Sequence, residues 1–273
     1  MKTLYLSDLD GTLLRSDLTL SDHTCSVISQ VVGMGVPFAF ATARSRTTAL
    51  KVTAGLDVPL PIIAYNGAFI VDTASGEILH KQTFTPAEAR EIYGCMCSFG
   101  LSPIVYRLFD GRERFSFYSD RVNRLTMDFI ESRGEDPRRD PLSDGDDILA
   151  GEPFYFNCIA EERALRGAYE QLRDKYEVLY YDDIYSGERW LELMPRGATK
   201  ASAALRLRDM LGCTRIAAFG DSVNDIPLFE AADERYAVAN ADPRLKALAD
   251  EVIPSNNDDG VALTLEKIIM NKE

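Results

Sequence analysis

The sequence feature that most constrains the fold is the regular alternation of short apolar runs with longer amphipathic stretches. In the first 65 residues, strand-like and helix-like segments follow one another as Thr3–Leu6, Ser21–Val32, Val36–Ala43, Arg46–Gly55 and Pro61–Tyr65. Apolar runs of this length are typical of buried strands, and the stretches between them are long enough for crossover helices. The alternation predicts an α/β fold with a doubly wound, mostly parallel Rossmann-like sheet.

This alternation stops after the third strand and returns near Thr199, which can cap a new helix. The residues in between predict short strands and helices of an α+β unit with an antiparallel sheet. We therefore expect one α/β core, residues 1–82 and 191–273, interrupted by an inserted α+β domain at residues 83–190. Within this insert, the polar stretch Gly134–Gly151 is predicted to be a solvated loop.

Charge balance and residue usage exclude several classes of function. The chain of 273 residues has 30 Lys and Arg against 43 Asp and Glu, a net charge of −13, so it has no general attraction for nucleic acid or an anionic membrane. No apolar stretch is long enough for a signal peptide or a membrane span, and we expect a cytoplasmic monomer or homodimer. Only His23 and His80 are present, and the five cysteines lack zinc-site spacing, which leaves metal binding and acid–base chemistry to carboxylates.

Polar residues gather where the predicted core strands end. Because ligands bind beyond the carboxyl ends of the strands in open α/β sheets, we expect these residues to lie close together. For any one of them, a helix cap or a turn is the simpler explanation. The strand ends and the start of the helix before Arg215–Phe219 contribute Asp8, Asp10, Thr12, Thr42, Arg44, Asn66, Lys200, Asp221, Asn224 and Asp225.

Asp8 and Asp10 indicate a catalytic metal site. Two carboxylates one residue apart after a buried strand repel each other, and a divalent cation with oxygen ligands, such as Mg²⁺, relieves that repulsion. A carboxylate beside Mg²⁺ can attack phosphorus to form an aspartyl phosphate, and a second carboxylic acid can protonate the leaving group and then activate water. Lys200 and the Thr42 hydroxyl can hold the phosphoryl oxygens. These residues are sufficient for phosphoester hydrolysis without histidine.

At these residues the chain resembles the haloacid dehalogenase (HAD) superfamily of phosphohydrolases. Asp8–Thr12 (DLDGT) matches the family's DxDGT motif, Thr42 matches the second-motif Ser or Thr, Lys200 matches the third-motif Lys, and Gly220–Asp225 (GDSVND) matches GDxxND. The large insert and the run Leu191–Lys200 (LELMPRGATK) resemble the Cof-like branch with a type-IIB cap. The resemblance covers the whole core; in the insert it concerns architecture rather than individual residues.

The resemblance implies a role for each motif residue. Asp8 would be the nucleophile and a Mg²⁺ ligand, and Asp10 would be the general acid/base and bind the metal through its backbone carbonyl. Asp221 would be the other main ligand, and Asp225 would support the metal shell or position the lysine. The residues implied at or close to the phosphoryl group are Thr42, Lys200 and Asn224.

Two further groups of residues have alternative interpretations. Arg44 and Arg46 follow the second strand and can either reach a substrate phosphate or begin a solvated helix, and we assign Arg44 to phosphate binding. An aromatic group in the insert can pack on a sugar face, but packing within the sheet is the simpler interpretation; its members are Tyr180, Tyr181, Tyr185 and Trp190.

We therefore expect a Mg²⁺-dependent phosphatase that hydrolyses small phosphorylated metabolites, with sugar phosphates first and nucleotide or cofactor phosphates next. The insert would be a mobile cap that closes on the substrate and selects it. A phosphomutase that returns the phosphoryl group to its substrate is one alternative. A non-enzymatic signalling protein that carries an aspartyl phosphate is the other.

Overall fold

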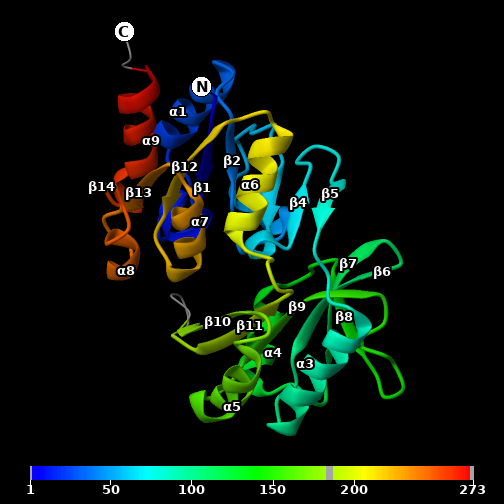
Figure 1. Ribbon diagram of the computed structural model, residues 1–273. Coiled ribbons are helices and arrows are strands. Elements are labelled where there is room, and N and C mark those ends of the chain that lie inside the picture. Colours follow the sequence, from blue (N-terminus) through cyan, green and yellow to red (C-terminus); the bar gives the residue numbers. More distant parts are fainter. Residues whose placement is uncertain (1, 183–186, 271–273) are drawn as a thin grey trace. The chain divides into compact units, whose positions relative to one another are not determined.

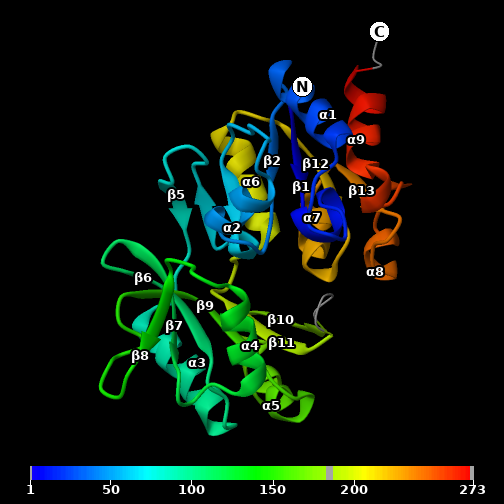
Figure 2. The same ribbon diagram turned by 180° about the vertical axis from the view of Figure 1, so that it is seen from behind.

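The computed structural model describes residues 2–182 and 187–270, in which the chain forms two compact units (Figures 1 and 2). The first unit combines Met1–Lys81 with Thr199–Glu273, and the second is Gln82–Ala198. We expected the core to resume at residue 191, but the structure moves this boundary to Thr199. The reason is that strand β11 (Arg189–Met194) pairs with two strands of the second unit.

The sheet of the first unit has five parallel strands in the order β14-β13-β12-β1-β2. The chain forms β1 and then β2 on one side of it, and β12, β13 and β14 spread in the other direction, so the order reverses beside β1. This reversal is the switch point at which open α/β sheets bind ligands. The strand bounds are β1 Thr3–Ser7, β2 Phe38–Phe40, β12 Arg215–Gly220, β13 Glu234–Val238 and β14 Glu251–Ile253.

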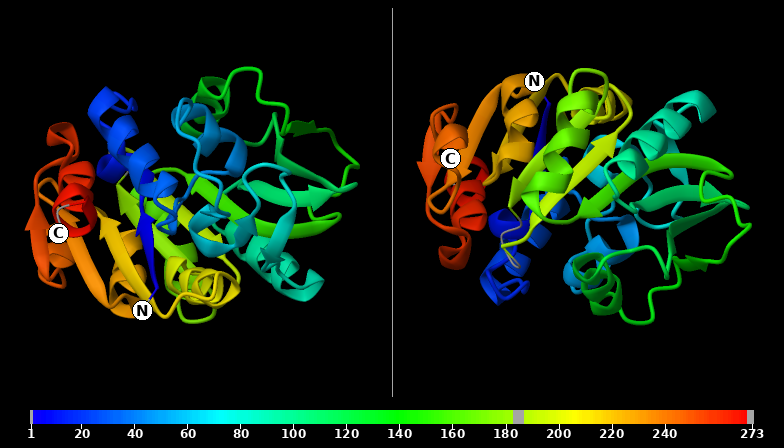
Figure 3. Two further views of the ribbon diagram at one scale, coloured as in Figure 1. Left: turned by 90° about the horizontal axis from the view of Figure 1, so that it is seen from above. Right: turned by 90° about the horizontal axis from the view of Figure 1, so that it is seen from below.

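Helices cover both faces of this sheet, as the predicted fold class requires. Helix α1 packs with α9 on one face, and α6 packs with α7 on the other (Figure 3). Ser21 caps α1 and Thr199 caps α6, because their side-chain oxygens accept backbone N–H groups of the first turn. The helix bounds are α1 Asp22–Gly33, α2 Arg46–Val52, α6 Lys200–Met210, α7 Ile226–Ala231, α8 Pro243–Lys246 and α9 Gly260–Leu265.

A small antiparallel sheet extends the first unit beyond β2. A parallel bridge between Ala41 and Ile63 joins the two sheets, so the chain after β2 and the chain after β3 lie side by side. This sheet consists of β3 Ile62–Ala64, β4 Phe69–Val71 and β5 Ile78–Lys81.

The second unit is built on a six-stranded sheet in the order β10-β11-β9-β6-β7-β8. All of its pairs are antiparallel except β7 with β8, in agreement with the expected α+β character. The predicted loop Gly134–Gly151 contains strand β8, because residues 139–142 pair with β7 along its free edge. The remaining bounds are α3 Pro86–Ser98, β6 Ile104–Phe109, β7 Arg112–Tyr118, α4 Arg124–Ser132, β8 Arg139–Leu142, β9 Glu152–Ile159, α5 Glu162–Leu172 and β10 Glu177–Asp182.

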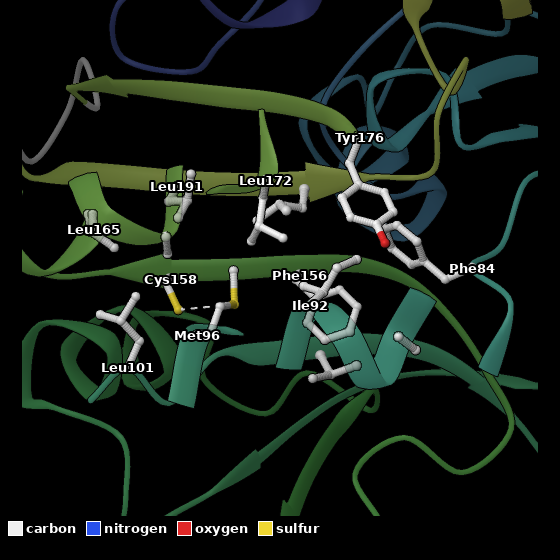
Figure 4. Packing of buried hydrophobic residues seen from close by; sticks show 14 of the residues in the cluster. Phe84, Ile92, Met96, Leu101, Phe156, Cys158, Leu165, Leu172, Tyr176 and Leu191 are labelled. Atoms are coloured by element: carbon white, nitrogen blue, oxygen red, sulfur yellow. Dashed lines mark hydrogen bonds between the residues drawn. The ribbon is translucent and has the colours of Figure 1, made fainter. Parts of the chain in front are cut away.

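One face of this second sheet is covered by α3 and α5. Figure 4 shows the buried group in which Phe156, Cys158 and Leu191 of the sheet pack with Met96 of α3 and Leu165 of α5. Helix α3 begins with a capping box, since the side chains of Thr85 and Glu88 each accept the other residue's backbone N–H. Alternate residues of β9 and β11 therefore face the other side of the sheet.

The fold class expected from the sequence is confirmed: a parallel α/β core carries an inserted α+β unit. Of the predicted aromatic group, Tyr185 lies outside the described residues. No helix in the described part of the chain is long and apolar enough to cross a membrane.

Candidate active site

The predicted site residues follow three neighbouring strands of the first unit. Asp8 comes directly after β1, Thr42 lies just beyond β2, and Asp221 follows β12. Because these strands are parallel and adjacent in the order β12-β1-β2, their carboxyl ends meet at one edge of the sheet. The backbone N–H of Asp8 donates to the carbonyl of Phe219 at 3.0 Å, which fixes the start of the first loop against β12.

Lys200 is the centre of the first hydrogen-bond network. Its Nζ donates to Oδ1 of Asp8 at 2.8 Å and to Oδ1 of Asp225 at 2.7 Å, and the residue is 1% exposed. The first turn of α6 holds this lysine close to Gly67, where a Cβ atom would lie 2.1 Å from the carbonyl oxygen of Thr199. Gly67 has a φ of +104°, so both the backbone conformation and the close contact require glycine.

Asp225 and Asp221 occupy one tight turn after β12. Oδ2 of Asp225 accepts the backbone N–H groups of Asp221 at 3.1 Å and Ser222 at 3.2 Å, so both carboxylate oxygens of Asp225 have donors. Oδ1 of Asp221 accepts the Thr12 hydroxyl at 2.8 Å. A Cβ at Gly11 would lie 2.4 Å from Oδ2 of Asp221, so this glycine lets the two loops approach.

The buried network has more negative than positive groups. Carboxylate oxygens of Asp8, Asp221 and Asp225 lie within 4.8 Å of one another, while Lys200 is the ammonium that contacts this group. Burial raises the pKa of Asp8 to about 7, and the charge of Lys200 offsets this only in part. Burial, together with the charges of Asp8 and Asp225, also raises the pKa of Asp221 well above its usual range.

The pKa of Lys200 shifts in the direction expected for an ion pair. Burial lowers it, but the charges of Asp225 and Asp8 outweigh burial, and the net pKa lies above its ordinary value. Lys200 thus stays charged. Its single positive charge does not balance the three acidic side chains of Asp8, Asp221 and Asp225. Oxygen ligands with excess negative charge are the donor set that suits Mg²⁺, so these residues fit the expected ion.

Asp10 belongs to a second, separate contact. Arg44 donates two hydrogen bonds to its carboxylate, from Nε to Oδ2 at 2.6 Å and from Nη2 to Oδ1 at 2.5 Å. The backbone N–H of Arg44 donates to Oγ1 of the buried Thr42 at 3.1 Å, so Thr42 orients the arginine backbone. Arg46, by contrast, bonds the carbonyls of Thr73 and Ala74, which gives it a structural role in the first unit.

Asn224, which precedes Asp225 in the chain, pairs with Asn66. Its Nδ2 donates to Oδ1 of Asn66 at 3.2 Å, which links the loop after β12 to the loop after β3. The structure thus groups the predicted residues as three contacts: Asp8 and Asp221 with Asp225 and Lys200, then Asp10 with Arg44 and Thr42, then Asn224 with Asn66.

Two supporting residues were given no role from the sequence, although Thr12 was named among the residues at the strand ends. Thr12 stands inside the DLDGT motif, and that position was the available signal for its bond to Asp221. Asn240 donates from Nδ2 to the Gly11 carbonyl at 2.7 Å and has no motif around it that would reveal this. Contacts between residues so distant in sequence depend on the completed fold.

Comparisons with known proteins agree with the geometry. The family described as haloacid dehalogenase-like hydrolase matches residues 5–265. In Bacillus subtilis, 5-amino-6-(5-phospho-D-ribitylamino)uracil phosphatase YwtE is 28% identical over 284 residues, which cover 96% of each chain. Phosphatase YwpJ of the same organism is 27% identical over 290 residues, covering 97% of this chain and 99% of the relative.

A solved structure supports the same assignment. The crystal structure of TM0651 from Thermotoga maritima has a TM-score of 0.80 and 25% sequence identity, with 98% of each chain covered. Because the family match spans nearly the whole chain and the relatives align from end to end, both units are included in the similarity. The chain therefore belongs to the haloacid dehalogenase-like hydrolases and is an enzyme of the phosphatase type.

Proposed function

We propose that the protein is a Mg²⁺-dependent phosphatase that hydrolyses monoesters of small metabolites through an aspartyl phosphate on Asp8. The observation that carries the proposal is the buried contact of Lys200 with Asp8 and Asp225 beside Asp221. A purely structural ion pair balances its charges, whereas here Lys200 contacts two carboxylates and a third, Asp221, lies beside them. An excess of negative charge in this cluster favours binding of a cation. A bound cation in turn attracts the negatively charged phosphate ester.

Asp8 and Asp221, with the backbone carbonyl of Asp10, are the ligands we assign to Mg²⁺. We assign Asp225 to support, because its two oxygens already accept bonds from Lys200 and from two backbone N–H groups. When bound, Mg²⁺ neutralises charge on the phosphoryl oxygens, so that a carboxylate can approach phosphorus.

The first chemical step is displacement at phosphorus. Lys200 holds Oδ1 of Asp8, so Oδ2 is the atom we assign to the attack. A bond forms between this oxygen and phosphorus while the bond from phosphorus to the ester oxygen breaks. Asp10, as the acid, gives its proton to the departing alkoxide, and the alcohol leaves.

The second step reverses the proton transfer. Asp10 is now a carboxylate and removes a proton from water, whose oxygen attacks the phosphorus of the aspartyl phosphate. The bond between phosphorus and Oδ2 of Asp8 breaks, which frees inorganic phosphate and restores the carboxylate. We assign Thr42, Lys200 and Asn224 to the phosphoryl oxygens, as expected from the motifs.

For Arg44 we propose a role different from the one expected from the sequence. Its Nε and Nη2 both donate to Asp10, so we assign it to positioning of the acid/base carboxylate rather than to phosphate binding. A bidentate arginine fixes the plane of a carboxylate, and proton transfer depends on that orientation.

We infer that the substrate is a phosphomonoester with a small, hydroxyl-bearing organic part. Sugar phosphates come first, as expected from the sequence. The relative YwtE is named for a second type of substrate, a ribitylaminouracil phosphate, which combines a sugar-alcohol chain with a heterocycle. We propose that the inserted unit selects among such compounds.

Phosphate release is the experiment that tests this function. A panel of sugar phosphates, nucleoside monophosphates and phenyl phosphate is incubated with Mg²⁺ or with EDTA. We expect release that needs Mg²⁺ and that is lost in Asp8→Asn, while the exposed control Asp209→Asn keeps wild-type rates. Substantial release by Asp8→Asn would contradict the mechanism, and a hexose phosphate isomer as product would indicate a mutase instead.

A further inference from the structure

Three consecutive residues between β3 and β4 have a left-handed backbone. The φ angles of Tyr65, Asn66 and Gly67 are +50°, +53° and +104°. Glycine adopts such angles freely and asparagine tolerates them, but a bulky residue such as tyrosine rarely does. We call this segment the left-handed turn and define it as Tyr65–Gly67. Backbone of this kind persists only where the surrounding structure holds it, and it is concentrated at functional sites.

The left-handed turn is packed into the first unit. Tyr65 is 4% exposed and Asn66 is 3% exposed. The Tyr65 ring meets Phe69 of β4 edge to face, with ring centroids 5.7 Å apart. The backbone N–H of Ala68 donates to the Tyr65 carbonyl at 3.1 Å and closes the turn. Packing on both the ring and the backbone therefore holds the unusual conformation in place.

The backbone of the turn bonds the loop that carries Thr42. The N–H of Asn66 donates to the Thr42 carbonyl at 3.0 Å, and the N–H of Tyr65 donates to the Arg44 carbonyl at 3.1 Å. The N–H of Thr42 in turn donates to the carbonyl of Ile63 in β3 at 2.9 Å. The peptide groups on both sides of Thr42 are thus held by the turn and by the strand that precedes it.

The same turn meets two further residues of the candidate site. A Cβ atom at Gly67 would lie 2.1 Å from the carbonyl oxygen of Thr199 and 2.9 Å from the backbone nitrogen of Lys200, so the turn abuts the start of α6. Oδ1 of Asn66 accepts Nδ2 of Asn224 at 3.2 Å. One short segment therefore contacts all three residues that we assign to the phosphoryl oxygens.

We propose that the left-handed turn is a positioning element for phosphate binding, in which Asn66 is the positioning residue that orients the Asn224 amide. The Nδ2 group of an asparagine has two hydrogens. One is donated to Asn66, which fixes the plane of the Asn224 amide, and the other is donated in a fixed direction to a phosphoryl oxygen. A donor that is already oriented needs no reorganisation when the phosphoryl group binds and reacts. This inference rests on the proposed function, because it concerns the residues that hold the phosphoryl group there.

A double-mutant cycle separates positioning through Asn224 from a purely structural role. Asn66→Gly removes the side chain and keeps a residue that adopts left-handed backbone, and Asn224→Ala removes the group that is oriented. The probe is inorganic phosphate with Mg²⁺, titrated by calorimetry into wild-type protein, the two single variants and the double variant. Lys200 and Thr42 remain in all four proteins, so phosphate binding should persist in each.

The expected effect depends on the background. Asn66→Gly should weaken phosphate binding by about fivefold in otherwise wild-type protein, the scale of one hydrogen bond. In the Asn224→Ala background the same change should weaken it by less than about twofold, because no amide is left to orient. The ratio of kcat/KM values for phenyl phosphate should follow the same pattern. Equal factors in the two backgrounds, or no change in otherwise wild-type protein, would overturn the inference.

Two controls accompany the cycle. Asp110→Gly replaces another left-handed residue, with a φ of +50° and an exposed side chain in the turn between β6 and β7, and should bind phosphate as wild type does. Thermal unfolding shows whether each variant has folded. Should Asn66→Gly not fold, Asn66→Ala removes the same side chain and takes its place, because glycine acts on the unfolded chain and alanine on the folded turn.

The outcomes distinguish this inference from the proposed function. Wild-type protein that binds phosphate but releases none from any ester would contradict the function, and the cycle in phosphate affinity would still test the inference. Wild-type protein that binds no phosphate in the presence of Mg²⁺ would contradict both.

Discussion

The lysine network of the first unit and the contact of Asn157 with Glu192 in the second both involve buried carboxylates, and different kinds of groups donate to them. In the first, Lys200 supplies a full positive charge to Asp8 and Asp225. In the second, Glu192 receives a tyrosine hydroxyl and an asparagine amide. The first arrangement suits ions, namely a cation and a phosphate. The two units thus carry the chemistry and, in our proposal, the selection.

Removal of the charged group from the lysine network should have the largest effect. Lys200→Met leaves Asp8 and Asp225 buried beside Asp221 without an ammonium, and we expect it to lower the free energy of unfolding by about 3–5 kcal/mol. Urea unfolding measures this loss, and Mg²⁺ should recover part of it. A variant as stable as wild type would show that the network is not held by charge.

Loss of the contact between Arg44 and Asp10 should reduce the rate of the chemical step. Arg44→Met removes the bidentate contact with the Asp10 carboxylate. We expect kcat to fall by about tenfold to a hundredfold with little change in KM, since acid–base catalysis contributes about 10²–10⁴. Arg44→Lys should restore part of the rate. Steady-state kinetics on the best substrate checks this; a rise in KM alone would return Arg44 to the phosphate-binding role expected from the sequence.

Stabilisation by Mg²⁺ should increase with pH. Because the pKa of Asp8 is raised to about 7, the metal-free folded protein binds a proton more tightly than the unfolded chain, so its stability falls as pH rises from about 4 through 7. Mg²⁺ requires the carboxylate form, and its apparent affinity should rise about tenfold between pH 6 and pH 8. Melting temperatures with and without Mg²⁺ over this range measure the trend, and a pH-independent increment would contradict it.

Removal of the charge of Glu192 should have the smallest effect on stability. Glu192→Gln keeps the size of a side chain to which Asn157 and Tyr155 donate through neutral groups, so we expect the free energy of unfolding to change by no more than about 1 kcal/mol. Urea unfolding beside Lys200→Met gives the comparison directly. Equal losses in the two variants would remove the distinction between the two regions.

Local patterns revealed most of the first unit. Asp8 and Asp221 follow short apolar runs that were interpreted as buried strands, and parallel order brings the ends of such strands together. Lys200 was assigned because it begins a capped helix inside a matching motif. The bidentate contact of Arg44 with Asp10 was not predicted, because side-chain pairing between two loops depends on their final conformations.

The second unit was less visible in the sequence. Strand β8 is polar and lies at a sheet edge, so no apolar period marks it, and its pairing with β7 depends on a neighbour already in place. The sequence pattern indicated that β11 is a strand, but it did not indicate which strands it pairs with. Because β11 pairs with strands of the second unit, the boundary lies at Thr199 rather than at residue 191. The pairing of Asn157 with Glu192 depends on strand register, which the sequence alone does not determine.

Trapping of the phosphorylated enzyme tests the central claim most directly. Wild-type protein is mixed with substrate and Mg²⁺, quenched in acid after a short interval, digested, and examined by peptide mass spectrometry. The account predicts one phosphoryl group on Asp8, absent with EDTA and absent in Asp8→Asn. A phosphoryl group on another residue, or phosphate release at wild-type rate by Asp8→Asn, would contradict the assignment of Asp8 as the nucleophile.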